Sequence, residues 1–426
     1  MNRKKRYVVM TFGSYGDVFP MLGLCEELKR RGEDVAFCSR PGTREMAERI
    51  GIEFIGAGDD ALYEESVRNP DIWHPWKASF MVAEKIGELI DPSYAVVRNE
   101  YEKHGEDLVV IASMLVFGAR LAREQWGFRL VTVHLQPLVF RDTRKPPRFS
   151  VYGPDMRKLP RWVNRGFYGV ADLLLDGVVR KPLNEWQVEH GIEPVKKGIF
   201  RDWGHSPDLV LGMFPEWFAE KGEEWPRVSE VVGFPVWDDE EKAGLSAELE
   251  AFLNGGDEGG SGGDRPVVIT PGSANVFGGK FIEVGVEACR KIGRRALVMT
   301  GYPEQICELK EGREMWCEYA PFDVLFKRVS VVMHHGGVGT TARCLGSGVP
   351  QIIMPLAHDQ PDNGQRVKEL GAGDWIAPKK FTVERVAARL EEMVGDAEMK
   401  SNCENMAGQI AGEDGVKRAV DLIVGE

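Results

Sequence analysis

The fold class of this chain is decided by one stretch, VSVVMHHGGVGTT at Val329–Thr341. Its apolar start is typical of a buried strand, and it then breaks into glycines and continues into a segment that can form a helix. When a strand is followed through a short glycine loop by a helix, backbone N–H groups point toward one position at the positive end of the helix dipole. The pattern therefore predicts an α/β fold and a site for a phosphate or diphosphate.

The overall composition narrows the class of protein. The chain has 426 residues, which predicts two domains, and its net charge of -12 argues against nucleic acid as a partner. The apolar run after the basic start covers only Tyr7–Phe12, so we expect no targeting segment and no integral membrane segment. Seven cysteines without a CxxC pair are typical of reduced thiols in a cytoplasmic protein and predict no metal site.

The N-terminal half repeats a strand–helix–strand pattern. A strand at Tyr7–Phe12 precedes an amphipathic helix at Phe19–Arg31 and a second strand at Asp34–Cys38. Further apolar runs predict strands at Asp107–Ile111, Arg129–Val133, Asp208–Gly212 and Ser229–Gly233. Continuous apolar runs of this kind are typical of parallel strands buried on both faces, so residues 1–235 are expected to form one Rossmann-like domain.

A change in composition separates this half from the next. Residues 236–265 are acidic and rich in glycine, which predicts a linker and a mobile loop. A second set of strands is predicted at Pro266–Thr270, Arg295–Thr300, Met315–Glu318, Val329–Met333 and Gln351–Met354. We therefore expect two facing, doubly wound parallel-sheet domains, with residues 266–426 forming the second and a last helix that packs back on the first.

The first loop of the chain, Gly13–Pro20, contains the first candidate for chemistry. It is only a loose match to a dinucleotide-binding fingerprint, because the third glycine is missing. Asp17 lies at the junction between the first predicted strand and the helix that follows it. It is either a residue that caps the helix or a general base, and on this loop alone the cap is favoured.

Two other loops of the C-terminal half carry polar groups suited to a ligand. The turn Thr270–Asn275 contains Ser273 and a glycine, and it is either an ordinary turn or a further phosphate-binding loop. The segment Pro350–Arg366 places His358, Asp359 and Gln360 after a buried strand, where carboxylate and amide groups can bind sugar hydroxyls. A metal site is disfavoured, because His358 and Asp359 have no partner ligand at helical spacing.

In this order, the four motifs resemble the family 1 glycosyltransferases of the GT-B fold. The matching segments are Gly13–Pro20, His334–Thr340, Gly348–Pro350 and Asp359–Gln360. The resemblance spans nearly the whole chain. Within the family the chain is similar to the rhamnosyltransferases of bacterial rhamnolipid synthesis, and it shares its core motifs with bacterial sterol and antibiotic glucosyltransferases.

The resemblance implies transfer of a hexose from a UDP- or dTDP-linked sugar to a hydroxyl group, with inversion and with no metal ion or other cofactor. It assigns the catalytic base to Asp17 and the diphosphate contact to His334, while His335 is expected to be packing. It implies that the residues that bind the donor are Ser273, Tyr319, Ala320, His334, Gly336, Gly337, Val338, Gly339, Thr340, His358, Asp359 and Gln360.

The acceptor is the least determined part of this interpretation. An apolar small molecule such as a hydroxy-fatty acid lipid is expected, with a sterol, phenolic or polyketide aglycone as the alternative. The candidate acceptor-binding residues are Ser14, Trp73, Trp76, Phe80, Phe117 and His134. Contact with a membrane surface is a further expectation. A nucleotide-sugar epimerase and a non-catalytic nucleotide-sugar-binding protein are the other functions compatible with these motifs.

Overall fold

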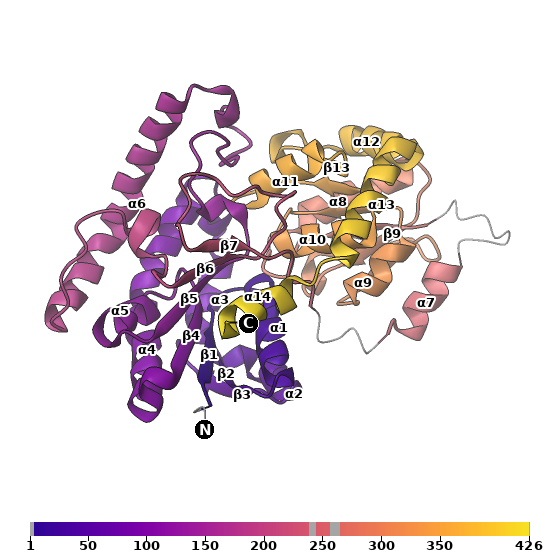
Figure 1. Cartoon of the computed structure of the whole chain (residues 1–426). Helices are drawn as coiled ribbons and strands as arrows, with labels where there is room; N and C mark the ends of the chain where they lie inside the picture. Colours follow the sequence, from indigo (N-terminus) through magenta and orange to yellow (C-terminus); the bar gives the residue numbers. More distant parts are fainter. Residues whose placement is uncertain (1–3, 238–243, 256–264, 426) are drawn as a thin grey trace. The chain divides into compact units, whose positions relative to one another are not determined.

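The chain forms two compact α/β units in the computed structural model, which describes residues 4–237, 244–255 and 265–425. Unit 1 comprises Met1–Arg148, Pro154–Trp237 and Asp414–Glu426, and unit 2 comprises Phe149–Gly153 and Asp238–Glu413. Each unit contains one sheet in which every paired strand is parallel (Figure 1). The predicted fold class, two doubly wound parallel-sheet domains, is confirmed.

The sheet of unit 1 has seven strands in the order β3-β2-β1-β4-β5-β6-β7. They are β1 (Arg6–Met10), β2 (Asp34–Ser39), β3 (Glu53–Gly56), β4 (Leu108–Ser113), β5 (Arg129–His134), β6 (Leu209–Gly212) and β7 (Ser229–Val231). The central strands are apolar and buried along their length, as the sequence pattern predicts. The edge strand β3 was not predicted, because it is short and only partly buried.

Helices pack around this sheet. They are α1 (Tyr15–Arg30), α2 (Arg44–Arg49), α3 (Asp60–Arg68), α4 (Lys77–His104), α5 (Phe117–Trp126), α6 (Arg161–Glu189) and α14 (Gly415–Val424). Helix α1 begins four residues before its predicted start, because Ser14 and Asp17 form a capping box ahead of Pro20. The last helix, α14, packs on α1 in unit 1 and buries Ala419, Val420 and Ile423 completely.

The sheet of unit 2 has six strands in the order β10-β9-β8-β11-β12-β13. They are β8 (Val267–Thr270), β9 (Ala296–Met299), β10 (Glu314–Cys317), β11 (Val331–His334), β12 (Gln351–Ile353) and β13 (Gly373–Trp375). The helices are α7 (Ala247–Asn254), α8 (Gly279–Lys291), α9 (Phe322–Leu325), α10 (Val338–Ser347), α11 (Gln360–Glu369), α12 (Val383–Gly395) and α13 (Ala397–Ala411).

The predicted linker, 236–265, falls partly outside the described residues. Its described part contains α7, whose N-cap Ser246 accepts a hydrogen bond from the Leu249 N–H, and Leu249 is buried in the core of unit 2. This part of the predicted linker therefore forms a helix. No helix in the described part of the chain is both long and apolar enough to cross a membrane.

Candidate functional site

Three loops of unit 2 start at the same level of the sheet. Thr270 at the end of β8 pairs with His334 at the end of β11, and His334 pairs in turn with Ile353 at the end of β12. The strand order reverses between β8 and β11, and ligands of doubly wound sheets bind at the carboxyl edge of such a switch point. The structure thus brings together the three motifs that the sequence separates by about 20 to 60 residues.

His335 lies between two glycines at this edge. A Cβ atom at Gly272 would lie 2.4 Å from His335 Cε1, and one at Gly337 would lie 2.6 Å from His335 Nε2. Gly272 also has a φ of 93°, which favours glycine. The residue is partly exposed, whereas its Nδ1 is buried and has no hydrogen-bond partner in the part of the chain that the structure describes. The two glycines therefore make room for the imidazole ring of His335.

The neighbouring His334 is fully buried, and both of its ring nitrogens are occupied. The Gly336 N–H donates to Nδ1 over 3.1 Å, so Nε2 carries the proton and donates to Gln351 Oε1 over 2.9 Å. A ring without exposed surface or a free nitrogen cannot contact a bound diphosphate. The geometry therefore gives His334 a role in holding the loop, whereas His335 is the partly exposed member of the pair.

Both histidines are neutral at pH 7. Burial lowers the pKa of His334 to about 3, with a smaller effect from His335. Burial and the nearby His358 lower the pKa of His335 to about 4. His335 can therefore offer a neutral N–H donor, and a bound anion would raise its pKa again.

The first turn of α10 supplies further donors. The Val338 N–H donates to Asp359 Oδ2 over 3.2 Å, and Asn363 Nδ2 donates to the same oxygen over 2.6 Å. The next two N–H groups, at Gly339 and Thr340, have no acceptor within the helix. A Cβ atom at Gly339 would meet no other atom within 4 Å, so the space beside this turn is open.

Asp359 and Gln360 follow β12 and begin α11. Gln360 is buried, and its Oε1 accepts hydrogen bonds from the N–H groups of Leu356 and Ala357 over 2.8 and 3.3 Å. This bonding gives Gln360 a role in holding its own loop, in contrast to the expected contact with a sugar. His358 has a φ of 57°, a left-handed conformation that costs a non-glycine residue free energy and is frequent at ligand sites.

The remaining predicted donor residues lie on neighbouring strand ends. Ser273 is exposed in the loop after β8, and its carbonyl oxygen accepts a hydrogen bond from the Tyr302 hydroxyl group over 3.2 Å. Tyr319 follows the edge strand β10 and is 38% exposed, whereas Ala320 is buried in the core. Only Ser273 and Tyr319 of these present a side chain at the surface.

Asp17 of unit 1 lies at the start of α1. The backbone N–H and the hydroxyl group of Ser14 donate to its Oδ2 over 3.0 and 3.1 Å. Burial raises the pKa of Asp17, and the two hydrogen bonds from Ser14 oppose that shift. A Cβ atom at Gly13 would lie 2.4 Å from Oδ2, so the carboxylate is held against the backbone. The capping role is therefore present, and Oδ1 receives no hydrogen bond from the described residues.

The candidate acceptor residues do not form one group. Phe117 is 1% exposed and belongs to the core beside β4, and His134 is 4% exposed. The His134 Nε2 lies 3.0 Å from Nδ1 of the buried His205, and burial holds the pKa of His134 well below its usual value. The expectation that these two residues line an acceptor site is wrong, because apolar packing has taken their side chains into the interior.

Trp73, Trp76 and Phe80 remain at the surface of unit 1. Trp73 ends a short 3-10 turn, Trp76 is 53% exposed directly before α4, and Phe80 is partly exposed in the first turn of that helix. The described residues contain no group of three or more His, Cys, Asp or Glu side chains that could hold a metal ion.

The known proteins that resemble this chain agree on one family. Residues 7–137 match the glycosyltransferase family 28 N-terminal domain, and residues 312–421 match the C-terminal domain of erythromycin biosynthesis protein CIII-like proteins. Together with the relatives and structures below, these matches decide the family. The chain is a family 1 glycosyltransferase of the GT-B fold.

The relatives are antibiotic and sterol glycosyltransferases. The O-mycaminosyltylonolide 6-deoxyallosyltransferase of Streptomyces fradiae is 29% identical over 98% of this chain and 96% of its own length. A sterol 3-beta-glucosyltransferase of Saccharomyces cerevisiae is 26% identical over 100% of this chain but 35% of its own length. The structure of the kitacinnamycin glycosyltransferase has a TM-score of 0.75, at 19% identity, and covers 99% of both chains.

His335 is the functional candidate that the sequence reasoning assigned to packing. No signal in the sequence could have found it, because the predicted strand ends at Met333, which would make His334 the first loop residue. β11 ends at His334, so His335 is the first loop residue and directly precedes the two glycines.

Proposed function

We propose that this glycosyltransferase moves a hexose or deoxyhexose from a UDP- or dTDP-linked sugar to a hydroxyl group of an apolar aglycone, with inversion. The observation that carries the donor half is the meeting of three loops at the switch point of unit 2. There the Ser273 loop follows β8, His335 and the open first turn of α10 follow β11, and Asp359 follows β12, three strands that are neighbours in the sheet. This combination suits a diphosphate that is attached to a polar sugar.

The donor diphosphate would lie against the first turn of α10. The N–H groups of Gly339 and Thr340 and the imidazole of His335 would donate hydrogen bonds to its oxygens. Ser273 would add a hydroxyl group from the loop after β8, and Asp359 would accept hydrogen bonds from the sugar. These donors stabilise the negative charge of the leaving diphosphate, so the reaction needs no metal ion. A chelator such as EDTA is therefore expected to leave turnover unchanged.

Asp17 would act as the base toward the acceptor. The acceptor oxygen attacks the anomeric carbon, the bond from that carbon to the diphosphate oxygen breaks, and the acceptor proton passes to the Asp17 carboxylate. The raised pKa of Asp17 makes it a better proton acceptor than an ordinary aspartate. The Ser14 bonds to Oδ2 hold the carboxylate in place and leave Oδ1 for the proton.

The names of the relatives favour an aglycone acceptor. The Streptomyces relative is named for O-mycaminosyltylonolide, a tylonolide that already carries a mycaminosyl group, and the yeast relative is named for a sterol. The exposed side chain of Trp76 and the partly exposed side chain of Phe80 are suited to contact such a ring system. A hydroxy-fatty acid lipid is the acceptor that an assay must compare with these.

The test is a matrix of donors and acceptors analysed by mass spectrometry. UDP-glucose and dTDP-rhamnose would each be incubated with a macrolide aglycone, a sterol and a hydroxy-fatty acid ester. A product heavier by one sugar is expected for at least one pair, and Asp17→Asn should not form it. Interconversion of the donor sugar without transfer would instead indicate an epimerase, and the absence of both reactions would refute the proposal.

A further inference from the structure

Asn363 joins two loops of the candidate donor site. It lies near the start of α11, it is 0% exposed, and its Nδ2 donates to two acceptors. One is the Gly336 carbonyl oxygen over 2.9 Å, in the loop after β11, and the other is Asp359 Oδ2 over 2.6 Å, in the loop after β12. An amide nitrogen has two hydrogens, so these bonds use its whole donor capacity. The side chain therefore connects the loops of two neighbouring strands.

The other end of the same amide is unpaired. Asn363 Oδ1 is buried and accepts no hydrogen bond from the residues that the structure describes. The two ends of the amide cannot be exchanged, because a carbonyl oxygen and a carboxylate both need a donor opposite them. A buried acceptor without a partner costs free energy, and packing alone would favour an apolar side chain at this place. The two donated bonds are therefore what the position requires.

The bond to Gly336 sets the direction of one peptide group in the loop. Gly336 is buried, its φ is 97°, and its N–H donates to His334 Nδ1 over 3.1 Å. Because a trans peptide is planar, the Gly337 N–H points opposite to the Gly336 carbonyl oxygen, and therefore away from Asn363. A carbonyl oxygen that faced a bound diphosphate would repel it, whereas an N–H group attracts it. Asn363 thus keeps this carbonyl oxygen turned into the protein.

The bond to Asp359 sets the direction of its carboxylate. The Val338 N–H, in the first turn of α10, donates to the same Oδ2 over 3.2 Å. Two donors on one oxygen hold the side chain so that Oδ2 faces the start of α10 and Oδ1 is directed away from that turn. Asp359 itself is partly exposed. Asn363 and Val338 together therefore determine which way a carboxylate at the edge of the site points.

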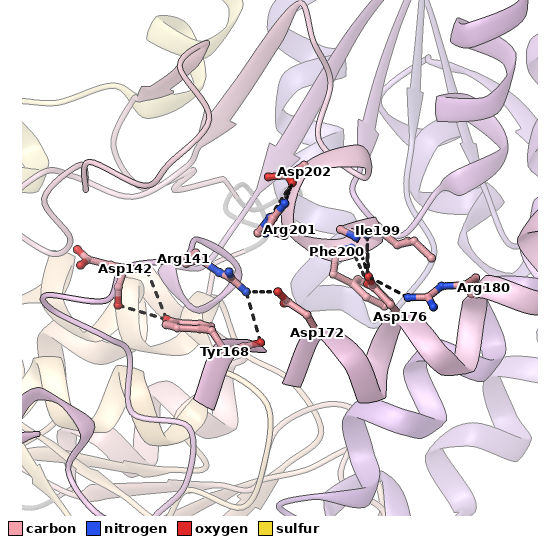
Figure 2. Close-up of polar contacts among 11 residues, drawn as sticks. Arg141, Asp142, Tyr168, Asp172, Asp176, Arg180, Ile199, Phe200, Arg201 and Asp202 are labelled. Carbon is pink, nitrogen blue, oxygen red and sulfur yellow. Dashed lines mark hydrogen bonds and ion pairs between the residues drawn. The ribbon is translucent and has the colours of Figure 1, made fainter. Parts of the chain in front are cut away.

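Asp176 of unit 1 offers a comparison within the same chain. It is 2% exposed, and its two carboxylate oxygens accept hydrogen bonds from the backbone N–H groups of Gly198, Ile199 and Phe200. Figure 2 shows this carboxylate enclosed by the backbone of the segment that it binds. Asp359 differs, because it is partly exposed and both Val338 and Asn363 bind the same oxygen. Asp176 therefore holds the fold together, whereas Asp359 is oriented without being enclosed.

We propose that Asn363 is a positioning residue of the donor site, which aims the Asp359 carboxylate at the hydroxyl groups of the donor sugar. The same side chain holds the Gly336 carbonyl oxygen away from the donor diphosphate. This inference rests on the proposed function, in which Asp359 accepts hydrogen bonds from the sugar. It adds that the contact with the sugar depends on a residue that does not touch the sugar. Loss of Asn363 should therefore weaken the binding of the sugar more than that of the nucleotide.

The test compares a nucleotide sugar with the nucleoside diphosphate that lacks the sugar. Titration calorimetry would use UDP-glucose and UDP, or dTDP-rhamnose and dTDP, according to the pair that the wild-type chain binds. Asn363→Asp keeps the shape of the side chain but replaces the donor with a second carboxylate, which repels Asp359. At about pH 8 this variant should lose at least about tenfold more affinity for the nucleotide sugar than for the nucleoside diphosphate.

Acid should partly restore this variant. Two adjacent carboxylates take up one shared proton more readily than a single carboxylate does, and the resulting O–H group can donate to its neighbour. The extra loss of affinity for the nucleotide sugar should therefore shrink when the pH is lowered to about 6. The wild-type chain is measured at each pH as the reference, because it contains the same nearby histidines, His335 and His358.

A double-mutant cycle shows whether Asn363 acts through Asp359. Asn363→Ser removes the bridging amide without adding a charge, and Asp359→Ala removes the carboxylate. Asn363→Ser alone should lower the affinity for the nucleotide sugar by about tenfold more than the affinity for the nucleoside diphosphate. In the Asp359→Ala chain this extra loss should be about threefold or less, because there is no carboxylate left to aim.

Asp362 provides a matched control at the neighbouring position of α11. It is 1% exposed, and its Oδ2 accepts a hydrogen bond from Arg366 Nε over 2.7 Å. Asp362→Asn makes the reverse chemical change, and it should lower the melting temperature while both ligands keep their wild-type ratio of affinities. Thermal melting of Asn363→Asp and Asn363→Ser is recorded in the same buffers, so that folded proteins are compared.

Asn363 would be a purely structural residue if Asn363→Asp weakened both ligands equally at every pH. The same conclusion would follow if Asn363→Ser had its full extra effect in the Asp359→Ala chain. In both cases a wild-type chain that transfers sugar would leave the proposed function standing. A wild-type chain that binds neither the nucleotide sugars nor the nucleoside diphosphates would instead overturn the donor site, and the role of Asn363 with it.

Discussion

Replacing the two adjacent histidines one at a time should separate stability from donor binding. His334→Ala removes a ring without exposed surface and leaves the Gly336 N–H and Gln351 Oε1 without partners. The lost packing costs about 2 to 4 kcal/mol and each buried unpaired group about 1 to 3 kcal/mol. Because the lost packing and the unpaired groups are not independent, we expect the free energy of unfolding to fall by about 4 kcal/mol. This corresponds to a decrease of about 10 °C in the melting temperature.

His335→Ala should lower the stability only slightly and should lower the affinity for nucleotide strongly. His335 is partly exposed and its buried Nδ1 has no partner among the residues that the structure describes, so removing the side chain should cost about 1 kcal/mol or less of the free energy of unfolding. A hydrogen bond from a neutral donor to a charged phosphate contributes about 1.5 to 3 kcal/mol. The affinity for UDP or dTDP should therefore fall by about tenfold to a hundredfold.

The measurements are calorimetric melting of both variants and titration calorimetry with the nucleoside diphosphate. His334→Ala will weaken binding as well, since it disturbs the loop, so stability is the quantity that discriminates between the two histidines. A His334→Ala variant that melts like the wild type but no longer binds nucleotide would show that His334 contacts the donor directly. The exchange of roles inferred from the structure would then be wrong.

Three further predictions concern the base, the open helix turn and acid. Asp17→Asn should lower turnover by about a hundredfold or more while nucleotide affinity stays constant, and near-normal turnover would exclude Asp17 as the base. Gly339→Ala should melt at or above the wild-type temperature but bind nucleotide at least about tenfold more weakly, because its methyl group enters the space assigned to the diphosphate. Stability should fall as the pH drops from about 6.5 toward 4, because unfolded histidines take up protons that the buried rings of His205 and His334, with pKa values of about 4 and about 3, do not. Each of these two histidines should lower the free energy of unfolding by about 2 kcal/mol at about pH 5. A urea midpoint that is the same at pH 5 and pH 8 would contradict these pKa shifts.

Much of the fold could be predicted from local pattern. Buried parallel strands such as β1, β4 and β11 are continuous apolar runs, and glycines mark the points where they hand over to helices. Strands of three or four residues at the sheet edges, such as β3 and β13, carry too little pattern to be predicted. Within the site, the order and spacing of the motifs were enough to indicate the family and the donor loops.

Other features depend on partners that are distant in the sequence. Phe117 and His134 have the composition of an acceptor site, but they pack against residues that only the folded sheet brings near. Helix α6 has apolar residues at helical spacing, which predicts a buried face. Its actual orientation is set by Arg141 and by the backbone of Gly198–Phe200, which bind its carboxylates.

The sequence by itself determined the two-domain α/β fold and the family, because strand periodicity, glycine turns and motif order are local properties of the chain. Only the tertiary structure decided which of His334 and His335 is buried and which is partly exposed. The two residues are adjacent and chemically identical, so no local preference separates them. Their difference arises from the strand register, from Gln351, which binds the His334 ring, and from Gly272, which leaves room for the His335 ring.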